Sequence, residues 1–366
     1  MALIVQKYGG ASLSDVAKIN KVARYIADLK SKGNQIVAVV SAMGYTTDEL
    51  VRMAHYVARK PEKREMDMLL SVGERITMSL LAMAIEDTGI AKAISYTGSQ
   101  VGIITDNQHT DARIVQIRSD RLNKALEDGK VIIVAGFQGV SLEREITTLG
   151  RGGSDTTAIA LAAALKADRC DLIKEVPGIF TADPATVIGA HPIPEVDFRA
   201  AKGLSLGGAR ILKDECVALA EKYGIEIRVG DGAQFTLIKE KPEKPFFSMT
   251  LKEKLTVFKG LTSEDAERFT PPLPTLLSSG ETMFAVTDAS SPKLNIDEDN
   301  VETIEGAACL TAVGAGVQRI PQLIQTDADV KKVFGFYLFC GECRVWFLSD
   351  KPKKTLQRTH DKMLKE

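Results

Sequence analysis

The sequence predicts an α/β protein in which a mostly parallel sheet is sandwiched by helices, followed by a smaller α+β region. Apolar runs typical of buried strands alternate with helical patterns over roughly the first 230 residues, as parallel sheets require. Two glycine-rich turns each stand directly before a helical pattern, an arrangement suited to anion binding at a helix N-terminus. Beyond a charged, proline-bearing segment at 239–245, short strand patterns are separated by helical ones.

The first strand and helix surround the first glycine turn. The apolar run 2–5 leads through Lys7 to Gly9-Gly10, and a helix follows with Ser14 as its expected N-cap and Asp15 in its first turn. Helical spacing predicts its buried face, at Ile19, Val22, Ile26 and Leu29. Further strands are predicted at 35–43, 91–96, 131–139, 170–176 and 225–229, and helices near 64–87, 155–167 and 213–223. Because ligands bind at the carboxyl ends of strands in such sheets, both glycine turns are expected to face one site.

We therefore expect an α/β domain over 1–232, a linker over 233–246 and an α+β region over 247–366. Strands in that last region are predicted at 254–259, 282–286, 307–313, 334–339 and 344–348, with a helix at 352–364. Cys340 and Cys343 form a CxxC pair, but no second pair follows to complete a zinc site, so a hairpin turn is favoured over metal or redox chemistry.

Composition and charge exclude several classes of protein. The 366 residues are 45% hydrophobic, enough for a large core, and 47 Lys and Arg balance 48 Asp and Glu. This balance argues against nucleic-acid and membrane partners. No apolar run of ~18 residues and no basic-then-apolar leader is found, so a cytoplasmic protein is expected. Cys170, Cys216 and Cys309 stand in apolar contexts and are expected to be reduced core residues.

The most informative segment is 147–155, a glycine-rich loop with Arg151 and Asp155 inside it. Glycines let the backbone approach a charged ligand, and the guanidinium can grip a carboxylate or phosphate through two hydrogen bonds. The loop is therefore predicted to hold an acidic small molecule. The alternative is a turn in which Ser154 or Asp155 merely caps the next helix.

The first glycine turn is less specific. Lys7 at the strand end can reach a phosphate lying over Gly9 and Gly10, but the turn matches neither the P-loop nor the dinucleotide-binding fingerprint. Alone, a lysine before such a turn is usually a solvated charge.

Six ordered motifs together carry a resemblance to a known family. They are Lys7-Tyr8-Gly9-Gly10, Ser41-Ala42-Met43-Gly44 with Thr46-Thr47-Asp48, the segment 70–75, Gly98-Ser99-Gln100, the loop 147–155, and Thr181-Ala182-Asp183-Pro184. This set resembles the aspartokinases, members of the amino acid kinase family. The resemblance implies the amino acid kinase fold over 1–232 and ATP-dependent phosphorylation of the β-carboxylate of L-aspartate to 4-phospho-L-aspartate, the first step toward lysine, threonine and methionine. It implies Mg²⁺ bound with ATP rather than by a cluster of protein ligands.

The same resemblance implies a regulatory tail of ACT modules that binds an amino-acid effector, lysine, threonine or both. Because such modules commonly pair their sheets between subunits, a homodimer or homotetramer is expected. The tail is short for two full modules, which leaves open whether one is degenerate and whether feedback control survives.

Site residues follow from the resemblance position by position. Arg151 matches the carboxylate clamp and Glu74 the acidic partner of the substrate ammonium, although the sequence pattern alone would make Glu74 a helix-surface charge. Lys7 matches the lysine that stabilises the phosphoryl group in flight, and Asp155 either orients Lys7 or holds magnesium. Further substrate contacts are expected from Ser41, Thr47 and Ser154. Further ATP contacts are expected from Tyr8, Gly9, Gly10, Ser12, Gly152, Gly153, Lys174, Glu175, Phe180, Asp183 and Arg210.

Four departures from the family pattern fall on the nucleotide side. They are Lys174-Glu175 in place of Thr-Asp, Phe180 in place of tyrosine, Ala185 in place of arginine, and Arg210 in place of a phosphate-contacting lysine. Lys213 resembles a phosphate-contacting lysine of other amino acid kinases and is expected, with Arg210, to supply catalytic charge. The departures keep two alternatives open: a kinase of a related acidic amino acid or using another nucleotide, and a catalytically weak regulatory homologue that binds amino acids.

Overall fold

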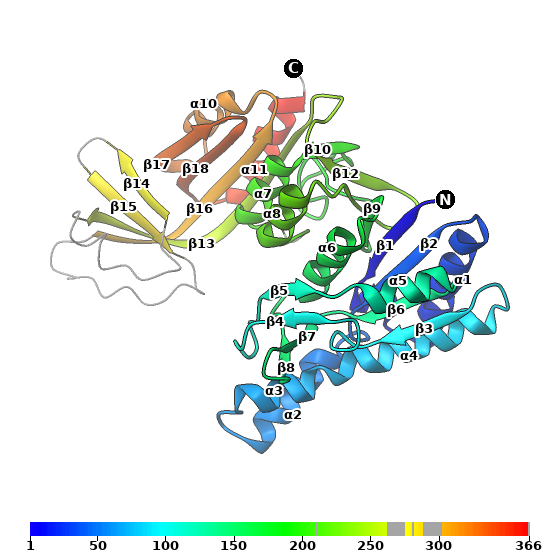
Figure 1. Cartoon of the computed structure of the whole chain (residues 1–366). Coiled ribbons are helices and arrows are strands. Elements are labelled where there is room, and N and C mark those ends of the chain that lie inside the picture. Colours follow the sequence, from blue (N-terminus) through cyan, green and yellow to red (C-terminus); the bar gives the residue numbers. More distant parts are fainter. Residues whose placement is uncertain (210, 262–274, 280–281, 288–301, 365–366) are drawn as a thin grey trace. The chain divides into compact units, whose positions relative to one another are not determined.

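The computed structural model describes residues 1–209, 211–261, 275–279, 282–287 and 302–364 (Figure 1). These residues form two compact units. The first comprises 1–179, 194–198 and 212–242, and the second comprises 180–193, 199–211 and 243–366.

An eight-stranded sheet organises the first unit. Its order is β10 (Glu195–Asp197), β12 (Phe235–Lys239), β11 (Ile227–Gly230), β9 (Arg169–Ile173), β1 (Leu3–Tyr8), β2 (Gln35–Val40), β6 (Val131–Ala135) and β3 (Ala93–Tyr96). All neighbours from β11 to β3 pair in parallel, and β12 runs antiparallel to β11. The predicted mostly parallel sheet is confirmed. The central strands are buried on both faces, which explains why they are continuous apolar runs.

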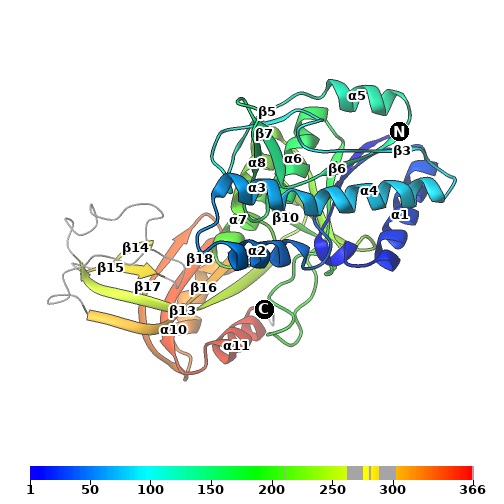
Figure 2. The same ribbon diagram turned by 90° about the horizontal axis from the view of Figure 1, so that it is seen from below.

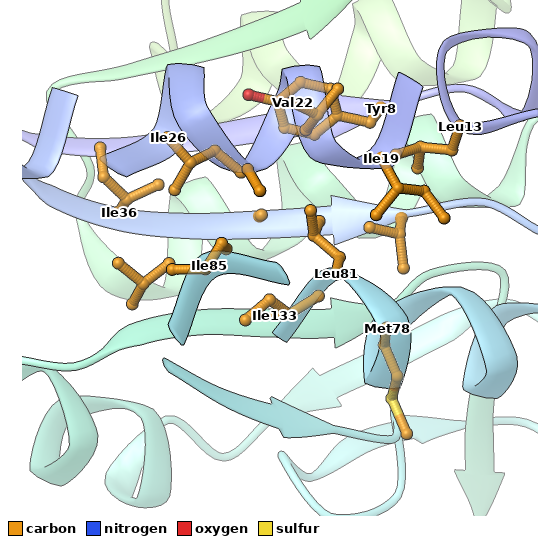
Figure 3. Close-up of a cluster of buried hydrophobic side chains, with 14 of the residues drawn as sticks. Tyr8, Leu13, Ile19, Val22, Ile26, Ile36, Met78, Leu81, Ile85 and Ile133 are labelled. Atoms are coloured by element: carbon orange, nitrogen blue, oxygen red, sulfur yellow. The ribbon is translucent and has the colours of Figure 1, made fainter. Parts of the chain in front are cut away.

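Helices α1 (Val16–Ser31) and α4 (Val72–Asp87) pack on one face of this sheet. Figure 3 shows the resulting core, in which Ile19, Val22 and Ile26 of α1 and Leu81 and Ile85 of α4 meet Tyr8, Ile36 and Ile133 of the strands. Because side chains alternate along a strand, Lys7 must point to the opposite face of β1 from Tyr8. Helix α6 (Gly153–Leu165) contacts β1 and β9, and it packs against α8 (Asp214–Tyr223).

A four-stranded sheet adjoins these elements, with the order β5 (Ile114–Ile117), β4 (Ile103–Thr105), β7 (Gln138–Ser141) and β8 (Ile146–Thr148). The single strand predicted at 131–139 is therefore two strands, β6 and β7, that belong to different sheets. The second glycine turn follows β8 of this smaller sheet, so the expectation that it ends a strand of the parallel sheet is wrong.

Helices α2 (Thr46–Val57), α3 (Lys63–Leu70) and α5 (Asp120–Glu127) complete the first unit (Figure 2). The helix predicted near 64–87 is divided into α3 and α4 at Ser71, whose carbonyl accepts a 2.9 Å hydrogen bond from the Gln138 side chain. The N-cap of α1 is Asp15, which accepts from the N–H of Lys18, rather than the expected Ser14.

The stretch Lys63–Asp87 has the length and hydropathy of a membrane-crossing helix, a property that buried helices share. In this protein it forms α3 and α4, and Leu81 and Ile85 of α4 are fully buried against the sheet.

The second unit is built on an antiparallel six-stranded sheet. Its order is β14 (Thr275–Ser279), β15 (Thr282–Thr287), β13 (Phe247–Leu261), β16 (Glu302–Gly314), β18 (Glu342–Ser349) and β17 (Val330–Phe339). Helices α10 (Ile320–Gln325) and α11 (Pro352–Leu364) pack against its strands. The predicted α+β character is confirmed. The CxxC segment lies at the β17–β18 hairpin, as predicted, and Cys340 and Cys343 are free thiols.

Segment 180–193 belongs to this second unit, although the sequence assigned it to the first. Ala182 and Val187 lie in one core with Leu310 and Leu356, and the Thr181 hydroxyl lies 2.9 Å from Nε2 of buried His360. The predicted linker is also wrong over Phe235–Lys239, which form β12 of the first sheet. The chain therefore passes between the two units several times instead of through one linker.

Candidate active site

A charge cluster lies at the carboxyl ends of the central strands β1 and β9 of the eight-stranded sheet. It consists of Lys7, Asp155 and Lys174. The ammonium of Lys7 lies 2.8 Å from Oδ1 of Asp155, and the ammonium of Lys174 lies 2.8 Å from Oδ2. Lys7 comes from β1, Asp155 from the first turn of α6, and Lys174 directly follows β9. Because β9 pairs in parallel with β1, the two lysines lie at the same, carboxyl-terminal, end of these strands. Lys7 and Asp155, which flank the two glycine turns, therefore meet, in keeping with the prediction that both turns face one site.

This cluster carries one positive charge in excess, since two ammonium groups share one carboxylate. Burial lowers the pKa of Lys7 below its usual value, although the charge of Asp155 opposes that shift. Burial alone would raise the pKa of Asp155, but the charges of Lys7 and Lys174 outweigh it and lower the pKa. Such a weakly solvated excess of positive charge attracts an anion.

The first glycine turn packs tightly against the segment that follows β2. A Cβ at Gly10 would lie 2.7 Å from the carbonyl oxygen of Ala42 and 3.0 Å from that of Gly44, so a larger residue would displace the backbone. The N–H of Gly44 donates to the Gly10 carbonyl at 3.0 Å, and the N–H of Ser12 donates to the Gly9 carbonyl at 3.0 Å. A Cβ at Gly9 would stand 3.6 Å from Nζ of Lys7, so the ammonium lies beside this turn.

Tyr8 does not face the cluster. Its ring is 1% exposed within the core under α1 (Figure 3), and its hydroxyl donates to Oε1 of Gln6 at 2.9 Å. The prediction that Tyr8 contacts ATP is therefore wrong for its side chain. Only its backbone lies at the site, where its carbonyl accepts from the N–H of Ser41.

The second glycine turn enters α6 through Gly152, whose φ of 78° favours glycine. Gly152 is the N-cap and no side chain caps the helix, so the alternative role of Ser154 or Asp155 as a cap is wrong. A Cβ at Gly152 would lie 2.9 Å from Cδ of Lys213, which places the stem of Lys213 against the turn. Gly153 and Ser154 are buried in the first turn of α6 beside Asp155.

Glu74 is a buried carboxylate on α4, not the surface charge that its helical pattern suggests. Its Oε1 accepts from the N–H of Ala42 at 3.0 Å, whereas its buried Oε2 has no hydrogen-bond partner among the described residues. Burial raises its pKa to about 7, although the Ala42 N–H and the charge of Lys7 oppose the shift. The close approach depends on Gly73, where a Cβ would lie 2.7 Å from Cβ of Ala42.

The remaining predicted substrate residues lie on the segment after β2 and on the second glycine turn. Ser41 and Thr47 are half-buried in the segment after β2, which also contacts Gly10 and Glu74. Arg151 is exposed on the second glycine turn and forms no ion pair with any residue that the structure describes. Its guanidinium is thus available for an anionic ligand.

The predicted nucleotide residues are divided between the two units. Glu175 is exposed and lies 3.6 Å from the Lys18 ammonium. Phe180 and Asp183 belong to the second unit, where the Asp183 carboxylate accepts from the N–H of Ala185 in a local turn. Arg210 lies outside the described residues.

Sequence reasoning missed two features of this site. The ion pair of Lys174 with Asp155 was not foreseen, because the resemblance assigns Lys174 only a contact with ATP. Gly136 was not singled out either, yet a Cβ there would lie 2.8 Å from Cβ of Ser154. Its position just after β6, at the carboxyl end of a central strand, was the available signal.

Within the described ranges, no group of three or more His, Cys, Asp or Glu side chains could hold a metal ion. Both oxygens of Asp155 lie 2.8 Å from an ammonium group, but only the contact of Oδ2 with Lys174 is also a hydrogen bond.

Comparison with known proteins gives one consistent result. Residues 2–231 match the model of the amino acid kinase family. An aspartokinase of Bacillus sp. (strain MGA3) is 45% identical over 302 residues, covering 81% of this chain and 71% of the relative. An aspartokinase of Mycolicibacterium smegmatis is 51% identical over 230 residues, covering 63% of this chain and 54% of the relative. The chain thus spans about half to seven tenths of the length of these relatives.

Solved structures of E. coli aspartokinase III share the fold. The complex with aspartate and ADP has a TM-score of 0.81 at 21% identity, covering 99% of this chain and 100% of the other. The complex with lysine and aspartate has a TM-score of 0.76 at 20% identity, covering 98% and 99%. These matches extend over both compact units.

Proposed function

Because the chain belongs to the amino acid kinase family and, within it, to the aspartokinases, we propose that it phosphorylates the β-carboxylate of L-aspartate with ATP. The products are 4-phospho-L-aspartate and ADP, in the opening step toward lysine, threonine and methionine. Its substrates are cytoplasmic metabolites, so the reaction belongs in the cytoplasm. The observation that carries the proposal is the cluster of Lys7, Asp155 and Lys174 between two glycine turns, with the buried Glu74 beside it.

L-Aspartate carries one ammonium and two carboxylates, and the site offers groups of matching charge. The unpartnered Oε2 of Glu74 is the acceptor for the ammonium. A cation beside Glu74 would favour its ionised form, so substrate binding and deprotonation of Glu74 support each other. Arg151 grips the α-carboxylate as a bidentate fork, while Ser41, Thr47 and Ser154 position the reacting carboxylate.

Phosphoryl transfer to a carboxylate needs charge neutralisation and alignment, since the nucleophile is already ionised and no general base is required. Lys7 neutralises the phosphoryl group in flight, and Asp155 holds the ammonium of Lys7 in place. The backbone at Gly9, Gly10, Gly152 and Gly153 lets the triphosphate approach. Magnesium would arrive bound to ATP and neutralise the phosphates.

The nucleotide side rests on a smaller set of observations. Lys213 lies against Gly152 and supplies a second cation toward the phosphates. Lys174 shares Asp155 with Lys7 and raises the positive charge of the site. Contacts from Ser12, Glu175, Phe180, Asp183 and Arg210 remain proposals that rest on the family resemblance.

The direct test is release of ADP in the presence of L-aspartate and MgATP. Removal of one charge-stabilising donor typically costs a hundredfold or more in rate, so Lys7→Ala should lower kcat by at least about 100-fold. Lys32→Ala is the matched control, because Lys32 is the C-cap of α1 and pairs with exposed Asp28. Turnover seen only with another acidic amino acid, or only with another nucleotide, would favour the alternative of a kinase with a related substrate or a different nucleotide. Aspartate binding without turnover would favour the regulatory homologue, for which the charge of Lys174 on Asp155 is the supporting observation.

The second unit is proposed to bind an amino-acid effector, lysine, threonine or both, and to form a homodimer or homotetramer. Its antiparallel sheet with packed helices supports an ACT-type module. Adding lysine and threonine to the ADP-release assay, separately and together, tests the effector. Unchanged rates at saturating concentrations of both would mean that feedback control has been lost.

A further inference from the structure

Asp67 is a fully buried carboxylate that the proposed mechanism does not use. It lies on α3 and is 0% exposed. Its Oδ1 accepts from the hydroxyl of Thr148 at 2.5 Å and from the N–H of Thr110 at 3.1 Å. Its Oδ2 lies 2.6 Å from Nδ1 of His109 and 3.2 Å from the same Thr110 N–H. Hydrogen bonds from several donors are what make a buried carboxylate tolerable.

One of these partners has a strained backbone. Thr110 has a φ of 70°, in the left-handed region that a β-branched residue rarely adopts. Such a conformation is unfavourable for a β-branched side chain and persists only where the surroundings impose it. Both oxygens of Asp67 accept from its N–H, so Asp67 is the group that holds Thr110 in this conformation.

The strained segment supports the turn that carries Arg151. Thr148 is the last residue of β8, and its carbonyl accepts from the N–H of Ala112 at 2.9 Å. Two residues later, Gly150 has a φ of 66°, and a Cβ there would lie 2.8 Å from Oδ1 of Asp111. The chain therefore turns at Gly150, one residue before Arg151, in close contact with the 109–112 segment.

We propose that Asp67 is a positioning residue for the substrate side of the site. It locks Thr110 and Thr148, and through them it fixes the turn at Gly150 and hence the direction in which Arg151 leaves the loop. Asp67 does not touch the substrate. Its effect on aspartate binding rests on the proposed function, whereas its effect on the loop does not. Misplacement of a clamp by about 1 Å can cost up to a hundredfold in rate or affinity.

Asp67→Ala tests this role through a split between KM and kcat. It should raise KM for aspartate at least about tenfold while kcat and KM for ATP change less than about threefold, because only ground-state placement of the carboxylate clamp is lost. Asp67→Asn keeps an acceptor for Thr110 and Thr148 and should restore most of the affinity. Thr148→Val keeps the side-chain shape, removes one bond to Asp67, and should raise the same KM about threefold or more even if the alanine variant does not fold.

Asp171→Ala is the matched control. Asp171 is also fully buried in the first unit, and it bonds to Gln6 and Arg169 on β1 and β9. It should lower thermal stability without changing KM for aspartate. If Asp67→Ala or Thr148→Val lowered kcat at constant KM, or changed KM no more than Asp171→Ala does, the proposal would be overturned.

Amide hydrogen exchange gives a readout that does not need turnover. The N–H groups of Leu149 and Gly153 are hydrogen-bonded to the carbonyls of Phe137 and Gly150. They should exchange faster in Asp67→Ala and Thr148→Val than in the wild type or in Asp171→Ala. If the wild type proved inactive on aspartate, the proposed function would fail while this comparison still decided the role of Asp67. Unchanged exchange in both variants would refute it.

Discussion

Glu74 couples substrate binding to pH. Its pKa of about 7, raised by burial, means that half of the free protein carries a neutral carboxyl at that pH. Only the ionised form attracts the substrate ammonium. We therefore expect kcat/KM for aspartate to rise about tenfold per pH unit below 7 and to level off above it. A profile that is flat between pH 6 and 8 would show that Glu74 does not bind the ammonium.

Because of Glu74, the free energy of unfolding should fall as pH rises, whereas kcat/KM should rise. Below pH 4.5 both the folded and the unfolded carboxyl are protonated. Between 4.5 and about 7 the unfolded state ionises while the folded state keeps its proton, so stability falls as pH rises. Glu74→Gln removes this loss and should be more stable than the wild type at pH 8 by up to about 3 kcal/mol. The two proteins should unfold alike near pH 4.5, as urea titrations at both pH values would measure.

At the level of elements, the first glycine turn depends on close backbone contact. Gly10→Ala places a Cβ against two carbonyl oxygens, of Ala42 and Gly44, which cannot move as a flexible side chain could. We expect KM for ATP to rise at least about tenfold, with a loss of about 1–3 kcal/mol in stability. Gly335→Ala on β17 is the control, since no atom of the described residues lies within 4 Å of its added Cβ. Equal effects of the two variants on KM would contradict a tight phosphate turn.

Periodicity predicted most elements, because it reports which face of a strand or helix is buried. It did not predict the break at Ser71, which depends on a side chain of β7 bonding to the Ser71 carbonyl from 67 positions away. It also merged β6 with the start of β7, since only Gly136 and Phe137 separate the two strands. Such long-range partners leave no local pattern in the sequence.

The site itself was predictable chiefly through the ordered motifs. They identified Lys7 and Asp155, 148 positions apart, as members of one site, and the 2.8 Å ion pair confirms that they meet. They did not distinguish side chain from backbone at Tyr8, because a motif does not record which face of β1 a residue occupies. The buried state of Glu74 likewise depends on the approach of Ala42 to Gly73, which is a tertiary contact.

For the whole molecule, the interleaved units have a consequence for truncation. Ala182 and Val187 are buried among residues of the six-stranded sheet and α11. A chain ending at residue 245 would lack the residues that bury Ala182 and Val187 and would leave these two side chains exposed. We expect it to bind the dye 8-anilinonaphthalene-1-sulfonate strongly and to unfold at lower temperature than the full chain. Weak dye binding and an unchanged Tm would show that segment 180–193 folds without the second unit.

Phosphorylation of the β-carboxylate of L-aspartate can be tested by identifying the atom that receives the phosphoryl group. L-Aspartate labelled with ¹³C at C4 is incubated with MgATP, the acyl phosphate is trapped with hydroxylamine, and the product is observed by ¹³C NMR. We expect a hydroxamate at the labelled carbon, formed by the wild type and by Lys32→Ala but not by Lys7→Ala. A hydroxamate at C1, none at all, or equal yields from Lys7→Ala would contradict it.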